Sequence, residues 1–261
     1  MEPKKVLVVY SDSKTKEHKK TITEIKRVLA KYKINSVFVK KEDKKKKLPK
    51  NTDLVISVGG DGTFIDASHL IKDDTLILGV NSDPLSSEGA HTNITRKDFE
   101  KRILQIINGD FAVEKWTRLE VIINSSKKKE YALNEIYIGA SHIYNTSRYS
   151  LFVNGKWERQ KSSGILISTG CGSTAWYSSA GGRPFSKTAK EGRFIVREPY
   201  CGHLVCGRTI SGIIKEGEEL KIKSEMRDGM IAIDSFKEYK FPKEKIVTVK
   251  VSNKSLNVVV F

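Results

Sequence analysis

Apolar positions in the first part of the chain alternate between continuous runs and helix-spaced sets. Four runs have the length of buried strands, and they lie at 6–10, 36–39, 54–58 and 76–80. Apolar residues three and four positions apart occupy Lys16–Tyr32, a stretch through Ala67 and Ile71, and Asp98–Asn108. Strands that alternate with helices in this way are typical of a parallel sheet with helices on both faces. We therefore expect residues 1–110 to form an α/β, Rossmann-like domain.

The pattern changes from about residue 111, where short β-type runs follow one another with little helix between them. These runs lie at 118–124, 130–138, 149–153, 164–168, 210–213, 219–223, 231–233 and 246–251. Regular short strands separated by Asn, Gly, Ser and Lys favour a sandwich-like architecture. We expect residues 111–261 to form a mainly β domain, with the option that its last segment packs back on the first domain.

Composition narrows the class of protein. A chain of 261 residues with 38% hydrophobic content can bury a real core. No stretch approaches the roughly 18 consecutive apolar residues of a membrane span, and the first residues do not resemble a secretory leader, so we expect a cytoplasmic protein without a membrane partner. The cysteines form no even framework and no metal-ligand spacing, so we expect free thiols and no zinc site at Cys171, Cys201 and Cys206.

The formal charge of +16 raises nucleic acid as a partner. The densest basic runs argue against it, because they lie in expected loops and lack interleaved aromatic residues for base stacking. These runs are Lys40–Lys41 with Lys44–Lys47, and Lys127–Lys129. We interpret them as solvated surface whose field favours polyanionic small molecules.

A glycine turn, Gly59-Gly60-Asp61-Gly62-Thr63, lies between the apolar run at 54–58 and a helix-spaced segment. Glycines let backbone N–H groups approach an anion, and the start of the following helix adds partial positive charge, so the turn is typical of a phosphate site. A carboxylate adds nothing to phosphate binding. Asp61 is therefore expected to accept a proton from an attacking hydroxyl or to act with Mg²⁺. The alternative is an ordinary β-turn with a solvated Asp.

Two later segments carry further candidate chemistry. Residues 168–176 (Ser-Thr-Gly-Cys-Gly-Ser-Thr-Ala-Trp) offer hydroxyls for phosphate or ribose and the Trp176 ring for stacking, or else form a tight bend where small residues pack. Asn134 and Glu135 have the donors and acceptors that suit ribose hydroxyls, or else are solvated at a strand end.

In this order, Gly-Gly-Asp-Gly-Thr, Asn-Glu and Thr-Gly-x-Gly-Ser-Thr-Ala resemble the motifs of the NAD kinase family. The resemblance extends over most of the chain, from about Val6 to the region of Asp234, and is strongest from Asp53 to Gly182. It implies transfer of the ATP γ-phosphoryl group to the 2′-hydroxyl of the adenosine ribose of NAD or NADH, with inorganic polyphosphate as an open alternative donor. Homodimers or homotetramers are implied as well.

Roles follow from the resemblance position by position. Asp61 is implied as the catalytic base, with no protein ligand for a metal because Mg²⁺ accompanies ATP. The phosphates are implied to meet Gly59, Gly60, Gly62 and Thr63. The dinucleotide is implied to meet Asn81, Asn134, Glu135, Ser163, Thr174, Ala175, Trp176 and Ser179.

A local likeness to the mitochondrial-type and plant NADH-preferring branch is carried by residues 80–89, 157–164 and 196–199. Many members have an Asp that contacts the dinucleotide where this chain has Ser163 in Lys-Ser-Ser-Gly. Loss of a carboxylate near the nicotinamide should weaken preference for the cationic oxidised ring. NADH is therefore expected to serve as well as NAD or better.

Two other classes of function stay open. A kinase of a lipid or another alcohol would keep the glycine turn and Asp61, but its acceptor site should be apolar. A non-catalytic binder would leave Asp61 without a purpose. Asp66 is interpreted as a solvated helical carboxylate, and Asp234 is given no role. Ordinary packing or surface positions are expected for His69, His91, His142 and His203.

Overall fold

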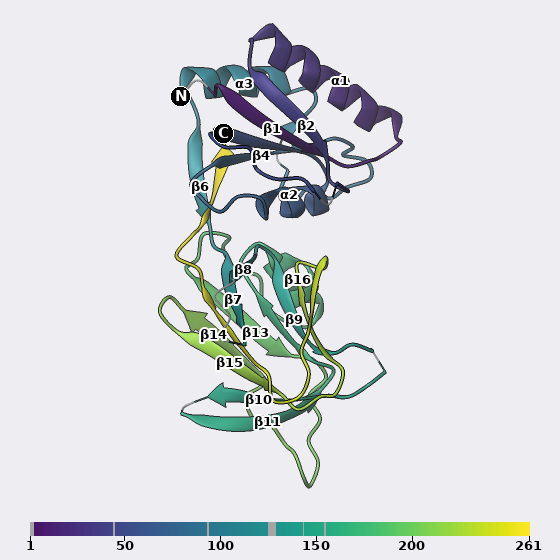
Figure 1. The fold of residues 1–261 in the computed structure, drawn as a ribbon, viewed down its shortest axis with the longest axis vertical. Helices are drawn as coiled ribbons and strands as arrows, with labels where there is room; N and C mark the ends of the chain where they lie inside the picture. Colours follow the sequence, from purple (N-terminus) through teal and green to yellow (C-terminus); the bar gives the residue numbers. More distant parts are fainter. Residues whose placement is uncertain (1–2, 44, 93, 125–128, 143, 154) are drawn as a thin grey trace. The chain divides into compact units, whose positions relative to one another are not determined.

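The computed structural model describes residues 3–43, 45–92, 94–124, 129–142, 144–153 and 155–261. The chain forms two compact units, Met1–Lys115 with Leu256–Phe261, and Trp116–Ser255 (Figure 1). We call them the α/β unit and the β unit and describe each by itself.

The α/β unit is built on a seven-stranded sheet in which β2-β1-β3-β4-β19-β6 is the strand order and β5 pairs with β4. Its strands are β1 (Lys5–Tyr10), β2 (Asn35–Lys40), β3 (Leu54–Gly59), β4 (Leu76–Asn81), β5 (Ile94–Thr95), β6 (Ala112–Trp116) and β19 (Leu256–Val260). Its helices are α1 (Lys16–Lys31), α2 (Asp61–Ser68) and α3 (Phe99–Asn108). Figure 1 shows α1 and α3 on one face of the sheet and α2 on the other.

Helix positions follow from local sequence. The Thr15 side chain caps α1 by accepting a hydrogen bond from the His18 backbone N–H at 3.3 Å. In the apolar stripe of this helix, Ile25, Val28 and Leu29 are fully buried. Gly109 ends α3 with φ +78°, a left-handed conformation that glycine adopts without steric cost.

Strand order fixes where a ligand belongs in this unit. β1 pairs in parallel with β2 on one side and β3 on the other, so the chain reverses its direction of winding between these pairs. Ligands of open α/β sheets bind beyond the carboxyl ends of the strands at such a reversal. The residues that follow those ends are Ser11 after β1 and Gly60 after β3.

The β unit is a sandwich of two six-stranded sheets, and its strand pairings are antiparallel. One sheet has the order β11-β10-β15-β18-β7-β8, with β7 (Leu119–Ile123), β8 (Lys129–Ala132), β10 (Ser147–Val153), β11 (Lys156–Ser162), β15 (Glu219–Ser224) and β18 (Ile246–Val251). The other has the order β14-β13-β12-β9-β16-β17, with β9 (Glu135–Ala140), β12 (Ile165–Ser168), β13 (Glu191–Val196), β14 (Ser211–Lys215), β16 (Gly229–Ile233) and β17 (Lys237–Lys240). One apolar cluster joins both sheets, with Val121 and Leu151 from the first and Ile138 and Ile167 from the second. The expected fold class, a parallel α/β domain followed by a mainly β domain, is confirmed.

Some strands differ from the sequence expectation. The run expected at 130–138 is two strands, β8 and β9, because the backbone N–H groups of Leu133 and Asn134 turn out of the ladder and donate to the Asp234 carboxylate. β11 was missed because it is polar; its conformation comes from seven antiparallel partners along β10.

The expectation of three free thiols was wrong. Cys201 and Cys206 form a disulfide, whereas Cys171 is free and buried. The two bonded residues face each other across an isolated antiparallel bridge that brings their Cα atoms to 4.1 Å. The spacing of the cysteines in the sequence does not predict a disulfide that depends on such a local hairpin.

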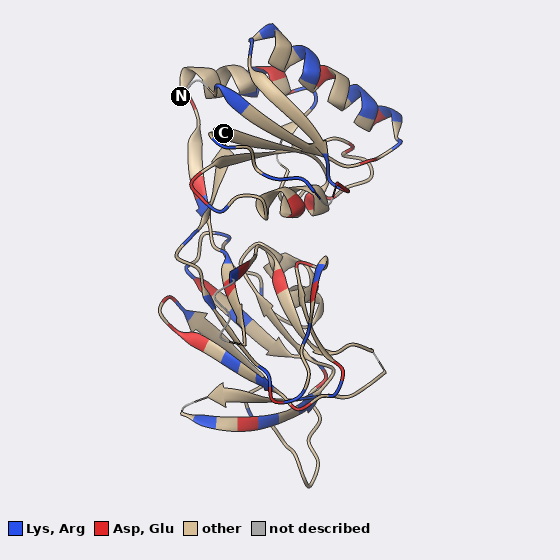
Figure 2. Cartoon of the chain, in the orientation of Figure 1, with Lys and Arg blue, Asp and Glu red and all other residues tan. Residues whose placement is uncertain are grey.

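Charged residues of both signs are interspersed along the ribbon of each unit (Figure 2). Lys40 pairs with Asp12 at 2.9 Å and Lys129 pairs with Glu120 at 3.0 Å, so these lysines do not form a field of free charges. Lys44, Lys127 and Lys128 lie outside the described residues. Within the described ranges, the helices are too short and too polar to cross a bilayer.

Candidate functional site

The glycine turn follows β3 directly, and Gly60 caps α2 without a side-chain hydrogen bond. A Cβ on Gly59 would lie 2.3 Å from Thr63 Oγ1, and a Cβ on Gly60 would lie 2.4 Å from Ser87 Oγ. Gly59 therefore has no room for a side chain, since Thr63 Cβ would also lie 2.9 Å away, whereas a side chain at Gly60 would require Ser87 to rotate. The turn stays closed because the Thr63 backbone N–H donates to Gly60 O at 2.9 Å. The result is a short, bare backbone at the start of α2, as anion binding requires.

Asp61 occupies the first position of α2, and its carboxylate is held from two sides. Oδ1 accepts the His91 backbone N–H at 2.7 Å, and Oδ2 accepts the Ala90 backbone N–H at 3.0 Å. Each carboxylate oxygen has a further lone pair, so the group can still accept from a substrate hydroxyl. The interpretation of Asp61 as a freely solvated turn residue is wrong, because the side chain is half-buried and fixed.

The segment that supplies these amides is shaped by Asn81 at the end of β4. The buried Asn81 side chain accepts the Asp83 backbone N–H at 3.1 Å and donates to Ser87 O at 3.4 Å. Gly89, at φ +72°, passes so close that a Cβ would lie 2.6 Å from Asn81 Nδ2. Asn81 thus holds the loop that ends in the two amides on Asp61.

A buried ion pair fixes α2 from the other side. Lys46 Nζ lies 3.1 Å from Asp66 Oδ2, and both side chains are 11% exposed. The ammonium also donates to Lys41 O, which binds the basic loop to the helix that begins with Asp61. The expectation that Asp66 is solvated was wrong. Within the basic run the expectation fails at Lys46, whereas Lys40, Lys45 and Lys47 are exposed.

In the β unit, Asn134 lies against the second glycine-rich segment. Thr169 N donates to Asn134 O at 2.9 Å, and a Cβ on Gly172 would lie 2.4 Å from the same oxygen. Gly170 is equally confined, because its Cβ would lie 1.9 Å from Ser186 O. The two motifs are therefore in backbone contact, and small residues are needed there for close packing.

Glu135 is buried, with 7% exposure, beside Asn134 at 9%. The alternative of solvated side chains at a strand end is therefore wrong. Burial, with a contribution from the nearby Asp234 charge, raises the pKa of Glu135 to about 7, against a hydrogen bond from Ser235 that lowers it. Among the described residues no group hydrogen-bonds to Glu135 Oε2, so this buried oxygen can accept from a ligand.

A second group of residues forms around Trp176, at the start of α4 (Trp176–Ser179). Its ring stacks on Tyr137 with centroids 5.4 Å apart, and the Arg197 guanidinium lies 5.2 Å from its centroid. Tyr137 Oη donates to Ser163 O at 3.0 Å, and Ser163 N donates to Arg197 O at 2.9 Å. The structure thus brings Ser163 and Trp176 together through Tyr137 and Arg197, which sequence reasoning missed.

The other residues of this segment that are expected to bind the dinucleotide are exposed, and they lie on a short 3₁₀ turn and on the α4 helix that follows it. They are Thr174, at the end of the 3₁₀ turn Gly172–Thr174, then Ala175 and Ser179. Their neighbours Gly172 and Ser173 are buried, so one side of the segment packs and the other is open to a ligand.

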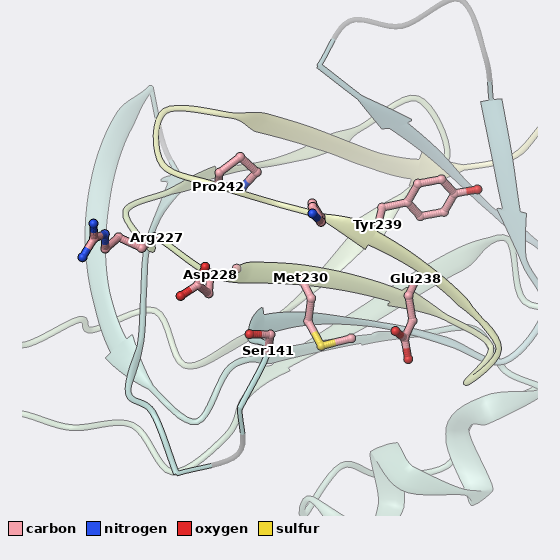
Figure 3. A pocket seen from close by; sticks show the side chains of 9 residues that line it. Ser141, Arg227, Asp228, Met230, Glu238, Tyr239 and Pro242 are labelled. Carbon is pink, nitrogen blue, oxygen red and sulfur yellow. The ribbon is translucent and has the colours of Figure 1, made fainter.

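A cavity of about 510 Å³ in the β unit contains none of the expected site residues. Figure 3 shows side chains that line it: Met230 on β16, Glu238 and Tyr239 on β17, and the charged Arg227 and Asp228 just before β16. Within the described residues, no cluster of three or more His, Cys, Asp or Glu side chains is arranged to bind a metal ion.

A parallel α/β unit with a carboxylate in its glycine turn, followed by a β-sandwich unit, is the arrangement expected above for a dinucleotide kinase. Family models described as the ATP-NAD kinase N-terminal domain and the ATP-NAD kinase C-terminal domain match residues 3–111 and 133–261. The chain belongs to the NAD kinase family. It is accordingly an enzyme, a kinase that acts on NAD or NADH, as the sequence predicted.

Relatives include both types of kinase. A probable NADH kinase of Oryza sativa subsp. japonica is 29% identical over 86% of this chain and 75% of its own length. An NAD kinase of Clostridium botulinum (strain Alaska E43 / Type E3) is 32% identical over 80% of this chain and 73% of its own length.

Solved structures agree in fold. Yeast NADH kinase complexed with NADH aligns with a TM-score of 0.81 at 16% identity, covering 100% of this chain and 84% of the other. An NAD kinase from Archaeoglobus fulgidus in complex with ATP aligns with a TM-score of 0.76 at 21% identity, covering 97% and 92%.

Proposed function

We propose that this chain transfers the γ-phosphoryl group of ATP to the 2′-hydroxyl of the adenosine ribose of NAD or NADH. The observation that carries the proposal is the Asp61 carboxylate, held by two backbone amides at the first turn of the helix that follows a bare glycine turn. Phosphoryl transfer depends mainly on positioning and on charge neutralisation, with one group to orient and deprotonate the nucleophile.

Asp61 acts as the general base. It accepts the proton of the 2′-hydroxyl as the ribose oxygen bonds to the γ-phosphorus and the bond from that phosphorus to the ADP oxygen breaks. The amides of Ala90 and His91 orient the carboxylate at 3.0 and 2.7 Å. An Asn side chain of the same shape would donate where the carboxylate accepts, so it could not take the proton.

The backbone of Gly59, Gly60 and Gly62 with Thr63 binds the ATP phosphates at the start of α2, where N–H groups point out of the helix. Mg²⁺ accompanies ATP and neutralises charge on the β- and γ-phosphates. No protein ligand to this cation is part of the proposal, because ATP would bring the cation on its own phosphate oxygens.

Asn81 and Asn134 bind the dinucleotide through their side-chain amides, and Glu135 binds it through its carboxylate. Glu135 Oε2 is buried and has no hydrogen-bond donor in the part of the chain that the structure describes, which supports this role because a ribose hydroxyl would supply one. The exposed side of the second glycine-rich segment, with Thr174, Ala175, Trp176 and Ser179, completes the dinucleotide surface of the β unit.

NADH serves at least as well as NAD. Ser163 carries no charge where many relatives are expected to carry a carboxylate, and the guanidinium of Arg197 beside the Trp176 face is paired with Glu198 at 3.5 Å, so that this pair adds no net charge. A cationic nicotinamide ring gains nothing from such surroundings, whereas the neutral reduced ring loses nothing. The proposal includes assembly of the chain as a homodimer or homotetramer. Size-exclusion chromatography with light scattering measures the mass of the assembly.

The test supplies purified protein with Mg²⁺ and each pairing of ATP or polyphosphate with NAD or NADH. Product is measured with an NADP-specific dehydrogenase, after oxidation of the reduced product. We expect product from both dinucleotides with ATP. Absence of product from every pairing, together with phosphorylation of a lipid alcohol such as diacylglycerol, would overturn the proposal in favour of a different alcohol kinase.

A further inference from the structure

The turn between β16 and β17 carries a buried carboxylate, Asp234, that the proposed chemistry does not use. Its side chain, 6% exposed, points into the backbone of the Asn134–Glu135 motif. Oδ2 accepts the Leu133 N–H at 2.8 Å, and Oδ1 accepts the N–H groups of Asn134 and Glu135 at 2.8 and 3.1 Å. Three consecutive amides, about a hundred residues away in sequence, thus converge on one side chain.

Only a carboxylate satisfies this arrangement. Three N–H donors need acceptor lone pairs on both oxygens, and an Asn side chain has one carbonyl oxygen and a donating NH₂. With Asn at this position, the NH₂ group would face the Leu133 N–H, and one buried donor would lose its acceptor. The choice of Asp is therefore specific to holding the backbone of the motif.

The backbone at this turn is strained. Asp234 and Ser235 have φ values of +50° and +60°, in the left-handed region that favours glycine, and neither is glycine. The strain keeps the Asp234 N–H on Glu135 O at 2.9 Å while the side chain reaches back to the amides. Such conformations persist where the surroundings determine them strongly, which happens most often at functional sites.

A second buried carboxylate beside Glu135 is electrostatically costly. Glu135 is already desolvated, and the charge of Asp234 further raises its pKa. A turn that served stability alone would gain nothing from this repulsion. The arrangement is explained if the position of the Asn134–Glu135 motif matters more for function than the repulsion between the Asp234 and Glu135 carboxylates.

We propose, on the basis of the function proposed above, that Asp234 is a positioning residue of the dinucleotide site. By accepting three backbone N–H groups it fixes Asn134 and Glu135 at the start of β9, so that their side chains are set for the ribose before the dinucleotide arrives. It touches neither substrate itself.

The test compares Asp234→Asn with Asp234→Glu and with a control, Asp228→Asn, an exposed carboxylate just before β16. For Asp234→Asn we expect at least a tenfold rise in the KM for NADH, with the KM for ATP within twofold of wild type. We expect the acid limb of the NADH KM profile to move to lower pH, because the neighbouring negative charge is gone. Asp234→Glu keeps the carboxylate and should recover part of the affinity, and Asp228→Asn should match wild type.

Equal changes in both KM values, or a fall only in the thermal midpoint and kcat with no change in KM, would overturn the inference in favour of a structural turn. If Asp234→Asn does not fold, Asp234→Glu decides the question, because its longer side chain alters the contacts with the three amides. A KM for NADH equal to that of wild type in Asp234→Glu would then contradict the inference. Failure of the proposed function is distinguishable, since it appears in wild type as absent product. NADH binding by calorimetry then gives the same comparison, with a tenfold weaker Kd for Asp234→Asn expected.

Discussion

The contact between Gly172 and the backbone of Asn134 is a steric constraint that joins two motifs of the candidate site. A Cβ at Gly172 would lie 2.4 Å from Asn134 O, 2.6 Å from its carbonyl carbon and 2.8 Å from its Cα. Each of the three atoms is main chain, so no side-chain rotation can relieve the overlap. Gly172→Ala therefore has to separate the second glycine-rich segment from the Asn134–Glu135 motif.

The size of the effect follows from these distances. Ordinary contact begins near 3.4 Å, so the segments must move apart by about 1 Å, the difference between 3.4 and 2.4 Å. Overpacking of this kind costs about 1–3 kcal/mol, and weakening the hydrogen bond from Thr169 N to Asn134 O adds about 1 kcal/mol. A displacement of about 1 Å at a substrate-positioning residue can cost about a hundredfold in rate.

Two measurements check this prediction. Thermal unfolding should show the midpoint lowered by about 5–10 °C. Steady-state kinetics should show kcat/KM for NADH reduced by about a hundredfold, with the KM for ATP little changed. The control is Gly217→Ala: its φ of +88° costs about 1–2 kcal/mol in any L-residue, but among the described residues, its two chain neighbours aside, no atom lies within 4 Å of the position that a Cβ would take.

The control should therefore lose stability without a change in the NADH parameters. The reasoning would be refuted if Gly172→Ala had wild-type kinetics for NADH, or if Gly217→Ala lost as much kcat/KM as Gly172→Ala. Either outcome would mean that the site does not depend on contact between the two motifs.

Three further predictions concern charge. Ser163→Asp should shift the ratio of kcat/KM for NAD to kcat/KM for NADH by about tenfold in favour of NAD, because a carboxylate about 6–8 Å from a cationic ring contributes about 1.4 kcal/mol in a partly screened site. Ser163→Asn is the uncharged control and should leave the ratio unchanged. An unchanged ratio in both variants would contradict the proposed use of NADH. Folding raises the pKa of Glu135 to about 7 and so favours the protonated carboxyl, which means that the stability this group contributes at low pH is lost as the pH rises from about 4.5 through 7. The affinity for NADH should rise over the upper part of the same range, because the ionised carboxylate accepts hydrogen bonds from ribose hydroxyls. Denaturant unfolding and calorimetry at several pH values check this, and both slopes should vanish in Glu135→Gln. Lys46→Met should lower the free energy of unfolding by about 2–4 kcal/mol by leaving Asp66 buried without its partner, and the double change with Asp66→Leu should recover most of it; additive losses in urea unfolding would show that the pair is not coupled.

Much of the fold could be predicted because the spacing of apolar residues along the chain indicates which segments form strands and which form helices. The buried strands of the α/β unit are continuous apolar runs, as parallel strands covered on both faces must be, and α1 carries a clear apolar stripe. The glycine turn was found because three glycines and an acid directly after a strand have few structural uses. Polar β11 could not be found in this way, since its conformation depends on pairing with β10.

The parts of the candidate site that escaped prediction are contacts between distant segments. The amides that hold Asp61 come from residues 90 and 91, where nothing in the side chains marks them. Asp234 meets the Asn134–Glu135 motif across about a hundred residues. Tyr137 was visible as an aromatic residue two positions after Glu135, on the same side of a strand, but its role required sight of Trp176.

The proposed reaction depends above all on Asp61 accepting the proton of the dinucleotide's ribose hydroxyl. The most direct test compares wild type and Asp61→Asn for NADH binding by calorimetry and for 2′-phosphorylated product with Mg²⁺ and ATP. We predict that kcat falls by at least about a hundredfold while the Kd for NADH stays within threefold of wild type. An Asp61→Asn protein that binds NADH normally and still forms product at a rate near that of wild type would contradict the claim.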